Sequence, residues 1–287
     1  MEEHGEGEFT ANDGGYYVGK WKDGRRDGFG FSVAPHEVVK CGVWAKGRFR
    51  GEQMLYHSER IYGIDISKYQ HVHKRRVYGI DWRNLRITRL GHTADRNALG
   101  AVDYPVSFVY IKSTEGLTVF NPYYTRDVRA ARRYGFPVGA YHFFSTRPAM
   151  RQADYFLKKS RLQKGDLPPM LDVELSDRRI AAMGGRDVLF REMLVWLKEV
   201  GRRSGTTPII YVSQDFVNRY MPFAPEELKA YPVWVARYGE YKPYVHLLYW
   251  QLSPDGRVRG IQGDVDIDVF NGSEEQFKRY LRTQTVK

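Results

Sequence analysis

Two acidic residues separated by one position interrupt an apolar segment near the middle of the chain. Asp172 and Glu174 fall in residues 168–175, which read PPMLDVEL. In a β-strand alternate side chains point to the same face, so the two carboxyls would share one cavity, with Cα atoms roughly 6.6 Å apart. Neighbouring carboxylates disfavour each other's ionisation, and apolar surroundings raise the pKa of one of them. Such a pair can supply one proton donor and one charged carboxylate, as glycoside cleavage requires. The structural alternative is a strand end whose acids face a loop or a helix N-terminus.

Length and composition allow one large domain with a small addition. The chain has 287 residues, and an α/β barrel takes about 250. No apolar run approaches the roughly 20 residues of a transmembrane helix. Residues 1–6 (MEEHGE) contain neither a basic nor an apolar stretch, so no secretory signal is visible. The single cysteine, Cys41, excludes an intramolecular disulfide and offers no thiolate cluster for a metal.

The formal net charge of +11 favours an anionic partner. Nucleic acid, an anionic membrane and an anionic cell wall all satisfy that requirement. Paired basic residues are scattered along the sequence rather than gathered in one stripe, so we expect no nucleic-acid interface. These pairs are Arg75-Arg76, Arg132-Arg133, Arg178-Arg179 and Arg202-Arg203.

An internal repeat occupies the first sixty residues. The sequence GKWKDG at 19–24 matches GVWAKG at 42–47, and Gly28 and Gly51 coincide at the same shift of 23 residues. Alternating aromatic and polar residues around Asp-Gly predict β-hairpins. The unit resembles a MORN repeat. We therefore expect residues 1–60 to form a small β-hairpin region and residues 61–287 the main domain. Packing on that domain is the simplest role of the repeats, and contact with a membrane or a partner protein is the alternative.

From residue 61 onward, eight strand-like segments alternate with helix-like segments, a pattern typical of βα units around a parallel sheet. The expected strands are 62–66, 108–112, 138–144, 169–173, 209–212, 233–236, 247–251 and 265–269. The expected helices are 121–134, 151–159, 186–203 and 225–230. The apolar residues of 83–104 follow neither a helical nor a strand period, so we expect an insertion or a long loop there.

Polar and aromatic residues cluster where the expected strands finish. In a parallel barrel those ends lie on one face, where the active sites of such barrels are found. The candidates are Asp65, Lys112, Tyr141, Asp172, Glu174, Tyr211, Trp234, Trp250, Gln251 and Asp266. Each has a structural alternative: Asp65 could cap a turn, for example. The acids recur singly at strand ends without an oxygen cage or a histidine cluster, so we expect no metal and no cofactor.

Nine short strings spread over about residues 61–272 resemble the family-25 glycoside hydrolases, the Chalaropsis-type lysozymes or N-acetylmuramidases. The strings are YGIDISKYQ (62–70), IDW (80–82), FVYIKSTEG (108–116), GAYHF (139–143), LDVE (171–174), PIIY (208–211), WVARY (234–238), WQ (250–251) and VDIDVF (265–270). The resemblance implies an α/β fold, an irregular TIM-like (β/α) barrel with eight strands and fewer than eight helices. It also implies cleavage of the β-1,4 bond between N-acetylmuramic acid and N-acetylglucosamine in peptidoglycan glycan strands.

The same resemblance assigns roles to residues. It implies that Glu174 is the proton donor and that Asp65, Asp172 and Asp266 are the other active-site acids. Tyr141 would lie beside the reacting sugar. Lys112, Tyr211, Trp234 and Gln251 would line the groove, and the strand-end position of Trp250 adds it to them. The chain departs from the family pattern in the long 83–107 stretch and at Asp268, where asparagine is more usual.

The mechanism follows in part from the residues. Glu174 would have its pKa raised by Asp172 and by apolar walls, while Asp172 would stay ionised. The attacking group could be a carboxylate, a water or the substrate's N-acetyl oxygen, depending on the carboxylate separation. The resemblance, with its N-acetylated substrate, favours N-acetyl participation.

Other functions would use the same features. The barrel could bind peptidoglycan without cutting it, the N-terminal repeats could make the protein a scaffold, or the barrel could be another glycosidase such as a chitinase. A peptidoglycan substrate implies an extracellular or cell-envelope location. The protein would then need a removed leader or a dedicated release route.

Overall fold

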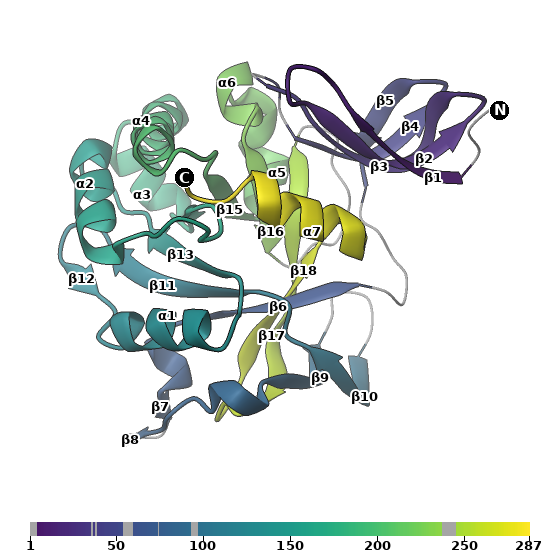
Figure 1. The fold of residues 1–287 in the computed structure, drawn as a ribbon. Helices are drawn as coiled ribbons and strands as arrows, with labels where there is room; N and C mark the ends of the chain where they lie inside the picture. The colour runs from purple at the N-terminus through teal and green to yellow at the C-terminus, as the bar shows by residue number, and fades with distance from the viewer. Residues whose placement is uncertain are drawn as a thin grey trace.

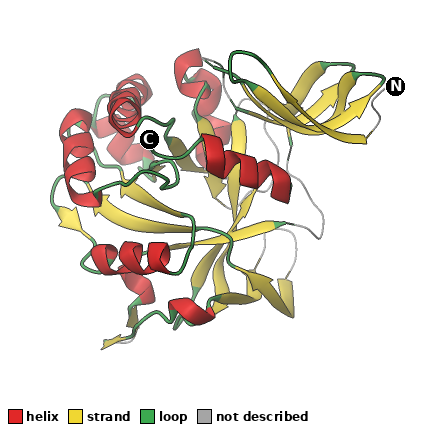
Figure 2. Cartoon of the chain, viewed as in Figure 1, coloured by secondary structure: helices red, strands yellow, loops and turns green. Residues whose placement is uncertain are grey.

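The computed structural model describes residues 5–35, 37, 39–53, 60–73, 75–92, 97–236 and 245–287, with the backbone alone for residues 97–100. Within them the chain forms a closed eight-stranded barrel, helices on its outer side, and a separate five-stranded sheet at the N-terminus. Figure 2 shows the strands of the barrel with the helices around them. The α/β barrel expected from the sequence is confirmed.

All eight expected barrel strands are present. They pair in the closed order β6-β11-β13-β14-β15-β16-β17-β18, and β18 returns to β6. Their bounds are β6 Ile61–Ile66, β11 Val109–Glu115, β13 Val138–Phe143, β14 Met170–Val173, β15 Ile209–Ser213, β16 Pro232–Ala236, β17 His246–Arg259 and β18 Val265–Phe270. Most are near-continuous apolar runs because parallel strands in a barrel are buried on both faces.

The direction of the last strand corrects the expectation of a fully parallel barrel. β18 runs antiparallel to both of its neighbours, β17 and β6. Asp266 therefore lies at the start of β18 rather than at its finish, and it faces Asp65 across the β18–β6 pair. An antiparallel strand presents its first residues at the end where parallel neighbours present their last.

The four expected helices are also confirmed. Seven α-helices lie in the described residues: α1 Tyr124–Arg133, α2 Ala149–Ser160, α3 Asp177–Ala182, α4 Arg186–Ser204, α5 Gln214–Arg219, α6 Glu226–Lys229 and α7 Glu274–Thr283. Three 3-10 helices accompany them: η1 Lys68–Gln70, η2 Trp82–Asn84 and η3 Met221–Phe223. We did not expect α7. Its start carries a sequence signal, a capping box in which Ser273 at the N-cap pairs reciprocally with Gln276.

Of the insertion or long loop expected over residues 83–104, the loop is wrong, because two strands form there. Strands β9 Arg86–His92 and β10 Asn97–Pro105 form an antiparallel pair, and β9 pairs with the extended end of β17. Val258 of β17 lies opposite Ile87, and both side chains are buried. Short pairs also form between β7 Val72–His73 and β8 Arg76–Val77, and between β12 Val119–Phe120 and β11.

Aromatic rings fill the barrel interior. Phe108 and Tyr110 pack edge to face against Trp234, which stacks on Tyr249 with ring centroids 4.8 Å apart. A second apolar layer lies between the strands and the helices that cover them. The interior is therefore a packed core, not a channel.

The N-terminal repeats form antiparallel hairpins, as expected. The strands are β1 Gly5–Thr10, β2 Tyr16–Lys22, β3 Arg25–Val33, β4 Lys40–Ala45 and β5 Arg48–Glu52, in sequential order. The turns at Asp23-Gly24 and Lys46-Gly47 both have positive φ at the two central residues, which is the two-residue turn that suits twisted hairpins. Equivalent repeat positions thus form equivalent turns.

The N-terminal sheet packs on the barrel and on α7, which lies between them in Figure 1. Phe31 contacts Phe270 of β18 and Tyr280 of α7 through their rings. Gln276 of α7 donates a hydrogen bond to the Val18 carbonyl at 2.9 Å. The sheet and barrel share one apolar cluster. The boundary at residue 60 stays a prediction, because residues 54–59 lie outside the described part of the chain.

Candidate active site

A cavity of about 560 Å³ opens at the end of the barrel where the parallel strands finish. Eight of the ten residues expected from the sequence line it: Asp65, Lys112, Tyr141, Asp172, Glu174, Tyr211, Gln251 and Asp266. All four candidate acids are among them. The strand ends therefore bring together residues that are up to about two hundred positions apart.

Strand register explains how these side chains become neighbours. Lys112 of β11 lies beside Tyr141 of β13. Asp172 of β14 lies beside Tyr211 of β15. Side chains in register on adjacent strands point to the same face, so each pair enters the cavity together.

Asp172 and Glu174 differ in their surroundings, which corrects one expectation. Asp172 is 7% exposed, whereas Glu174 follows the last residue of β14 and is exposed. Burial, and then the charge of Glu174, raise the pKa of Asp172 well above its usual range, while Lys112 opposes that rise. The sequence had led us to expect the apolar walls around Glu174 and an ionised Asp172. Glu174 lies one residue beyond the end of β14, so the apolar walls enclose Asp172 instead.

Three further carboxyls form a cluster across β6 and β18. Asp65 is 8% exposed, and Asp268 is completely buried. Burial raises the pKa of Asp65 well above its usual range, and Asp266 and Asp268 add to the rise. Burial and the charge of Asp266 raise the pKa of Asp268 in the same way, although hydrogen bonding from Trp234 and Asp65 opposes the rise. Carboxyls this close together cannot all ionise near neutral pH.

Hydrogen bonds fix the position of Asp266. The Tyr211 hydroxyl donates to Oε1 of Gln251 at 3.2 Å. Nε2 of Gln251 donates in turn to Oδ1 of Asp266 at 2.7 Å. Because the amide of Gln251 is oriented on both sides, the Asp266 carboxyl is held in the cavity wall.

Lys112 supplies a cation to this acidic cavity. Its Nζ lies 2.8 Å from Oε2 of Glu115 and 4.4 Å from the centre of the Phe143 ring. The Lys112 side chain is 20% exposed, so its charge is only partly screened by water.

Two expected groove residues lie elsewhere. Trp234 is fully buried in the aromatic interior, and Trp250 is 2% exposed in the apolar layer between strands and helices. Neither lines the cavity. Gln251 points inward, so its neighbour Trp250 points outward, because side chains alternate along a strand. Trp234 lies below the layer of side chains that lines the cavity. Arg237 and Tyr238, which belong to one of the matching strings, lie outside the described residues.

Several residues that line the cavity were not expected from the sequence. Tyr69 is 68% exposed at the cavity, and Phe143 and Asp215 also line it. Tyr69 lies in one of the matching strings, so an exposed aromatic beyond the end of β6 was a usable signal. Asp215 lies in the first turn of α5, beyond the end of β15, so a search of residues at strand ends did not include it.

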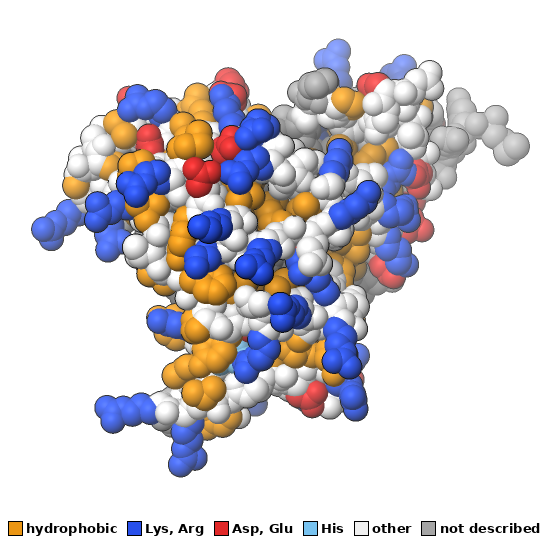
Figure 3. Space-filling view, turned by 60° about the vertical axis from the view of Figure 1, so that its left-hand side comes forward, with side chains coloured by type: hydrophobic (Ala, Val, Ile, Leu, Met, Phe, Trp, Pro, Cys, Tyr) orange, Lys and Arg blue, Asp and Glu red, His pale blue; other side chains and the backbone are white. Residues whose placement is uncertain are grey.

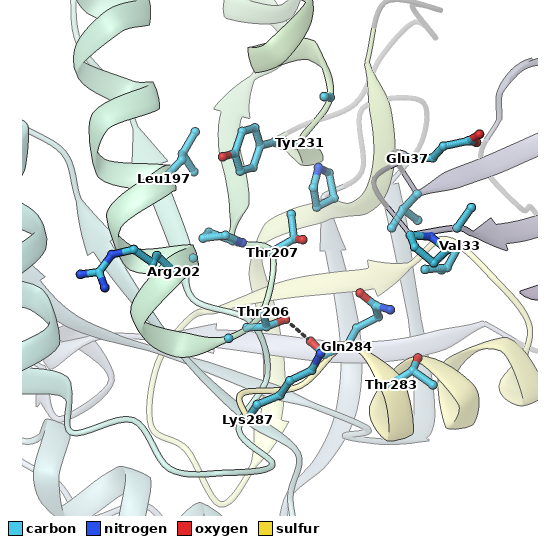
Figure 4. Close-up of a pocket in the computed structure, with 18 of the residues that line it drawn as sticks. Val33, Glu37, Leu197, Arg202, Thr206, Thr207, Tyr231, Thr283, Gln284 and Lys287 are labelled. Carbon is cyan, nitrogen blue, oxygen red and sulfur yellow. Dashed lines mark hydrogen bonds between the residues drawn. The ribbon is translucent and has the colours of Figure 1, made fainter. Parts of the chain in front are cut away.

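A larger cavity, of about 1110 Å³, lies between the N-terminal sheet and the opposite end of the barrel (Figure 4). Its lining includes Pro208 and Pro232, at the starts of β15 and β16. Its two lining carboxylates, Glu37 and Glu227, pair with Lys40 and Lys198 at 3.1 and 2.7 Å. It therefore has greater volume but lacks the buried acid cluster, and the smaller cavity is the candidate active site.

The described residues contain no group of three or more His, Cys, Asp or Glu side chains placed to hold a metal ion. Within the same part of the chain, no helix has the length and apolar character needed to cross a bilayer.

Residues 64–261 match the family described as Glycosyl hydrolases family 25. The chain is 33% identical over 228 residues to the protein named YegX of Escherichia coli K12, covering 78% of this chain and 74% of that one. It is 29% identical to Lysozyme M1 of Streptomyces globisporus, covering 74% and 68%. The bacterial lysozyme of Streptomyces coelicolor has a similar structure, with a TM-score of 0.61 at 26% identity, covering 78% and 96%.

The protein belongs to glycosyl hydrolase family 25. It is therefore a glycoside hydrolase, and the resemblance found in the sequence is confirmed.

Proposed function

We propose that this protein is an N-acetylmuramidase that cleaves the β-1,4 bond between N-acetylmuramic acid and N-acetylglucosamine in peptidoglycan. The observation that carries the proposal is the convergence of Asp65, Asp172, Glu174 and Asp266 on one cavity of sugar size. The names of two relatives, Lysozyme M1 of Streptomyces globisporus and the N,O-diacetylmuramidase of Chalaropsis, support the same activity.

In the first step Glu174 gives its proton to the glycosidic oxygen. The bond from C1 of N-acetylmuramic acid to that oxygen breaks, and N-acetylglucosamine leaves with a free hydroxyl. The N-acetyl oxygen of the substrate bonds to C1 and forms an oxazolinium ion. A bound sugar would cover Glu174 and remove water from it, which favours its protonated form.

Asp172 stabilises the positive charge on the oxazolinium ion. It lies deeper than Glu174, and although burial raises its pKa, the cation of Lys112 and the positive charge that develops on the substrate both favour its ionised form. In the second step a water molecule attacks C1 and opens the oxazolinium ring, which restores the N-acetyl group. The Glu174 carboxylate takes up the proton that the water loses. Asp65 and Asp266 hold sugar hydroxyls in the cavity. Both steps conserve protons, and Glu174 returns to its starting state.

Purified peptidoglycan tests this assignment. The Glu174→Gln substitution should lower turnover about 10²- to 10⁴-fold, because a glutamine cannot donate the proton, while binding to the polymer persists. Activity is measured by the release of soluble fragments, and binding by sedimentation with the insoluble polymer. Chitin serves as the comparison substrate. Turnover by Glu174→Gln at the parent rate, or a preference for chitin, would contradict the assignment.

The substrate places the site of action at the cell envelope or outside the cell. We infer that the protein reaches the wall through an export signal or a dedicated release route. Fractionation of the producing cells tests this, because a protein confined to the cytosol would contradict it.

The N-terminal repeats offer a further contact to a membrane or a partner protein through the side that does not pack on the barrel. Phe9 of β1 is 47% exposed and is one apolar side chain available there. Lipid binding and pull-down by the full chain, compared with the Phe9→Ser variant, test this contact. Equal retention of the two proteins would argue against a role for Phe9.

A further inference from the structure

Most of the net charge is concentrated in one segment. Residues 121–165 contain ten Lys or Arg residues and two Asp residues, a net charge of +8, against +11 for the whole chain. The segment covers α1, β13 and α2 and the start of the loop that leads to β14. Although the basic pairs are scattered along the sequence, this one segment therefore carries a strong excess of positive charge.

Of the two acids of this segment, one is buried and the other is exposed but paired with a cation from another helix. Asp127 is 1% exposed and lies 2.6 Å from Nε2 of His71. Asp154 is paired at 2.7 Å with Arg203, which comes from α4. Each carboxylate is thus engaged by a side chain from outside the segment, and Asp127 also lies 3.6 Å from Nε of Arg126 within it.

Contacts between the two helices bring the cations onto one flank of the barrel. The Tyr124 hydroxyl at the start of α1 donates to the Ser160 carbonyl at the end of α2, at 2.9 Å. At the other end of α1, Arg132 donates to both oxygens of Asp166 at 3.0 and 2.6 Å. The loop after α2 therefore runs beside α1 along its length.

We call six of the exposed cations of these elements the basic flank. They are Arg129, Arg133, Lys158, Lys159, Arg161 and Lys164. Figure 3 shows a face of the protein on which Lys and Arg side chains are abundant and Asp and Glu are few.

Helix capping explains only part of the basic flank. Cations in the last turn of a helix stabilise its dipole, and Arg133, Lys158 and Lys159 occupy such positions. Arg129 lies further inside α1, and Lys164 lies in the loop beyond α2. Arg161 adopts a left-handed conformation with φ of 46°, which glycine or asparagine would adopt at lower cost. The flank thus carries more cations than helix stability requires.

We propose that the basic flank is a second contact surface for peptidoglycan, which binds the carboxylates of the polymer's peptides away from the cavity. This inference rests on the proposed function. Both helices contact β11, which carries Lys112 into the cavity, so the flank and the cavity share one strand of the barrel. Lysine and arginine on a broad exposed surface attract a polyanion from several directions and raise its local concentration.

The test measures binding without turnover. Every protein carries Glu174→Gln, and the probe is insoluble peptidoglycan freed of accessory polymers, at about 50 mM ionic strength, where screening is modest. The flank variant combines Arg133→Gln, Lys158→Gln, Lys159→Gln and Lys164→Gln. The control variant removes the same charge from the N-terminal sheet through Lys20→Gln, Lys22→Gln, Arg25→Gln and Arg48→Gln, all at exposed positions.

The flank variant should bind about tenfold more weakly, because each lost contact with the polyanion contributes a modest amount. The control should bind as the parent does, and amidation of the peptidoglycan carboxylates should reduce parent binding to the level of the flank variant. Equal losses in both variants, no loss in either, or retention on anionic phospholipid vesicles without retention on peptidoglycan would overturn the proposal. Cleavage of short soluble glycans by the chain with Glu174 intact tests the proposed function separately.

Discussion

At the scale of single residues, the active site depends on which acids are buried. Asp172 and Asp268 lie within the protein, while Glu174 lies at the mouth of the cavity. The burial of Asp172 makes its ionisation sensitive to neighbouring charges, of which Lys112 lowers its pKa and Glu115 raises it. Two neighbours with opposite effects allow the role of Asp172 to be tested without altering it.

Lys112→Met should move the acid limb of the activity profile to higher pH by about 0.5 to 1 unit. The reason is that the pKa of Asp172 rises further when the cation is removed, and the Asp172 carboxylate is needed for the reaction. Glu115→Gln should move the same limb to lower pH. The measurement is kcat/KM against pH on soluble peptidoglycan fragments. Both variants break the Lys112–Glu115 ion pair, so shifts in the same direction would contradict the electrostatic account.

Asp268→Asn should stabilise the protein at neutral pH more than at acid pH. Because burial raises the folded-state pKa of Asp268, folding requires proton uptake above the ordinary Asp range, and stability falls as the pH rises towards the folded-state pKa. The titratable side chains that face Asp268 are Asp65, Asp266, Tyr211 and Tyr249.

Urea unfolding measures the effect. The variant should match the parent near pH 4 and exceed its free energy of unfolding by about 1 to 3 kcal/mol at pH 7. Asp264→Asn is the control, since the Asp264 side chain is 59% exposed. A gain of equal size at both pH values, or a loss at pH 7, would show that Asp268 is not the buried acid described above.

At the scale of elements, the sequence predicted the barrel strands well because each is an apolar run of strand length. It did not predict the direction of β18, since the pattern of alternation is the same in both directions. It also missed β9 and β10. β9 pairs with β17, which is more than 150 residues away, and Thr88 and Arg89 separate its apolar residues Ile87 and Leu90. Position near the end of an expected strand singled out Trp234, but the sequence could not show how deep in the barrel its side chain lies.

Two strand glycines make room for the aromatic interior. A Cβ at Gly139 would lie 2.4 Å from the Tyr110 ring, and one at Gly63 would lie 2.3 Å from the Phe108 ring. Gly139→Ala and Gly63→Ala should each lower the free energy of unfolding by about 1 to 3 kcal/mol, because the rings must move to accommodate the methyl group. Gly79→Ala is the matched control, since a Cβ there meets nothing within 4 Å. Urea unfolding that ranks all three variants together would refute this packing account.

At the scale of the whole molecule, the N-terminal sheet and the barrel share an apolar cluster. Phe31 is fully buried between them. The repeat in the sequence predicted the hairpins but could not predict where they pack, because the contacts join Phe31 to Phe270 and Tyr280, far along the chain. We therefore expect the sheet and the barrel to unfold together.

Phe31→Ala should lower the free energy of unfolding by about 3 to 5 kcal/mol, and unfolding should remain a single transition. Tryptophan fluorescence and residual activity follow it together, since Trp21 and Trp44 lie in the sheet and Trp196 and Trp234 in the barrel. Phe9→Ala, at an exposed position, should change little. Separate transitions of the sheet and the barrel would contradict the shared core.

The chemical identity of the new reducing ends tests the account most directly. Purified peptidoglycan is digested with the full chain, and the soluble products are reduced and analysed by mass spectrometry. Acid catalysis at C1 of N-acetylmuramic acid predicts fragments that end in reduced N-acetylmuramic acid, and their absence with Glu174→Gln. Fragments that end in reduced N-acetylglucosamine, or unchanged digestion by Glu174→Gln, would contradict it.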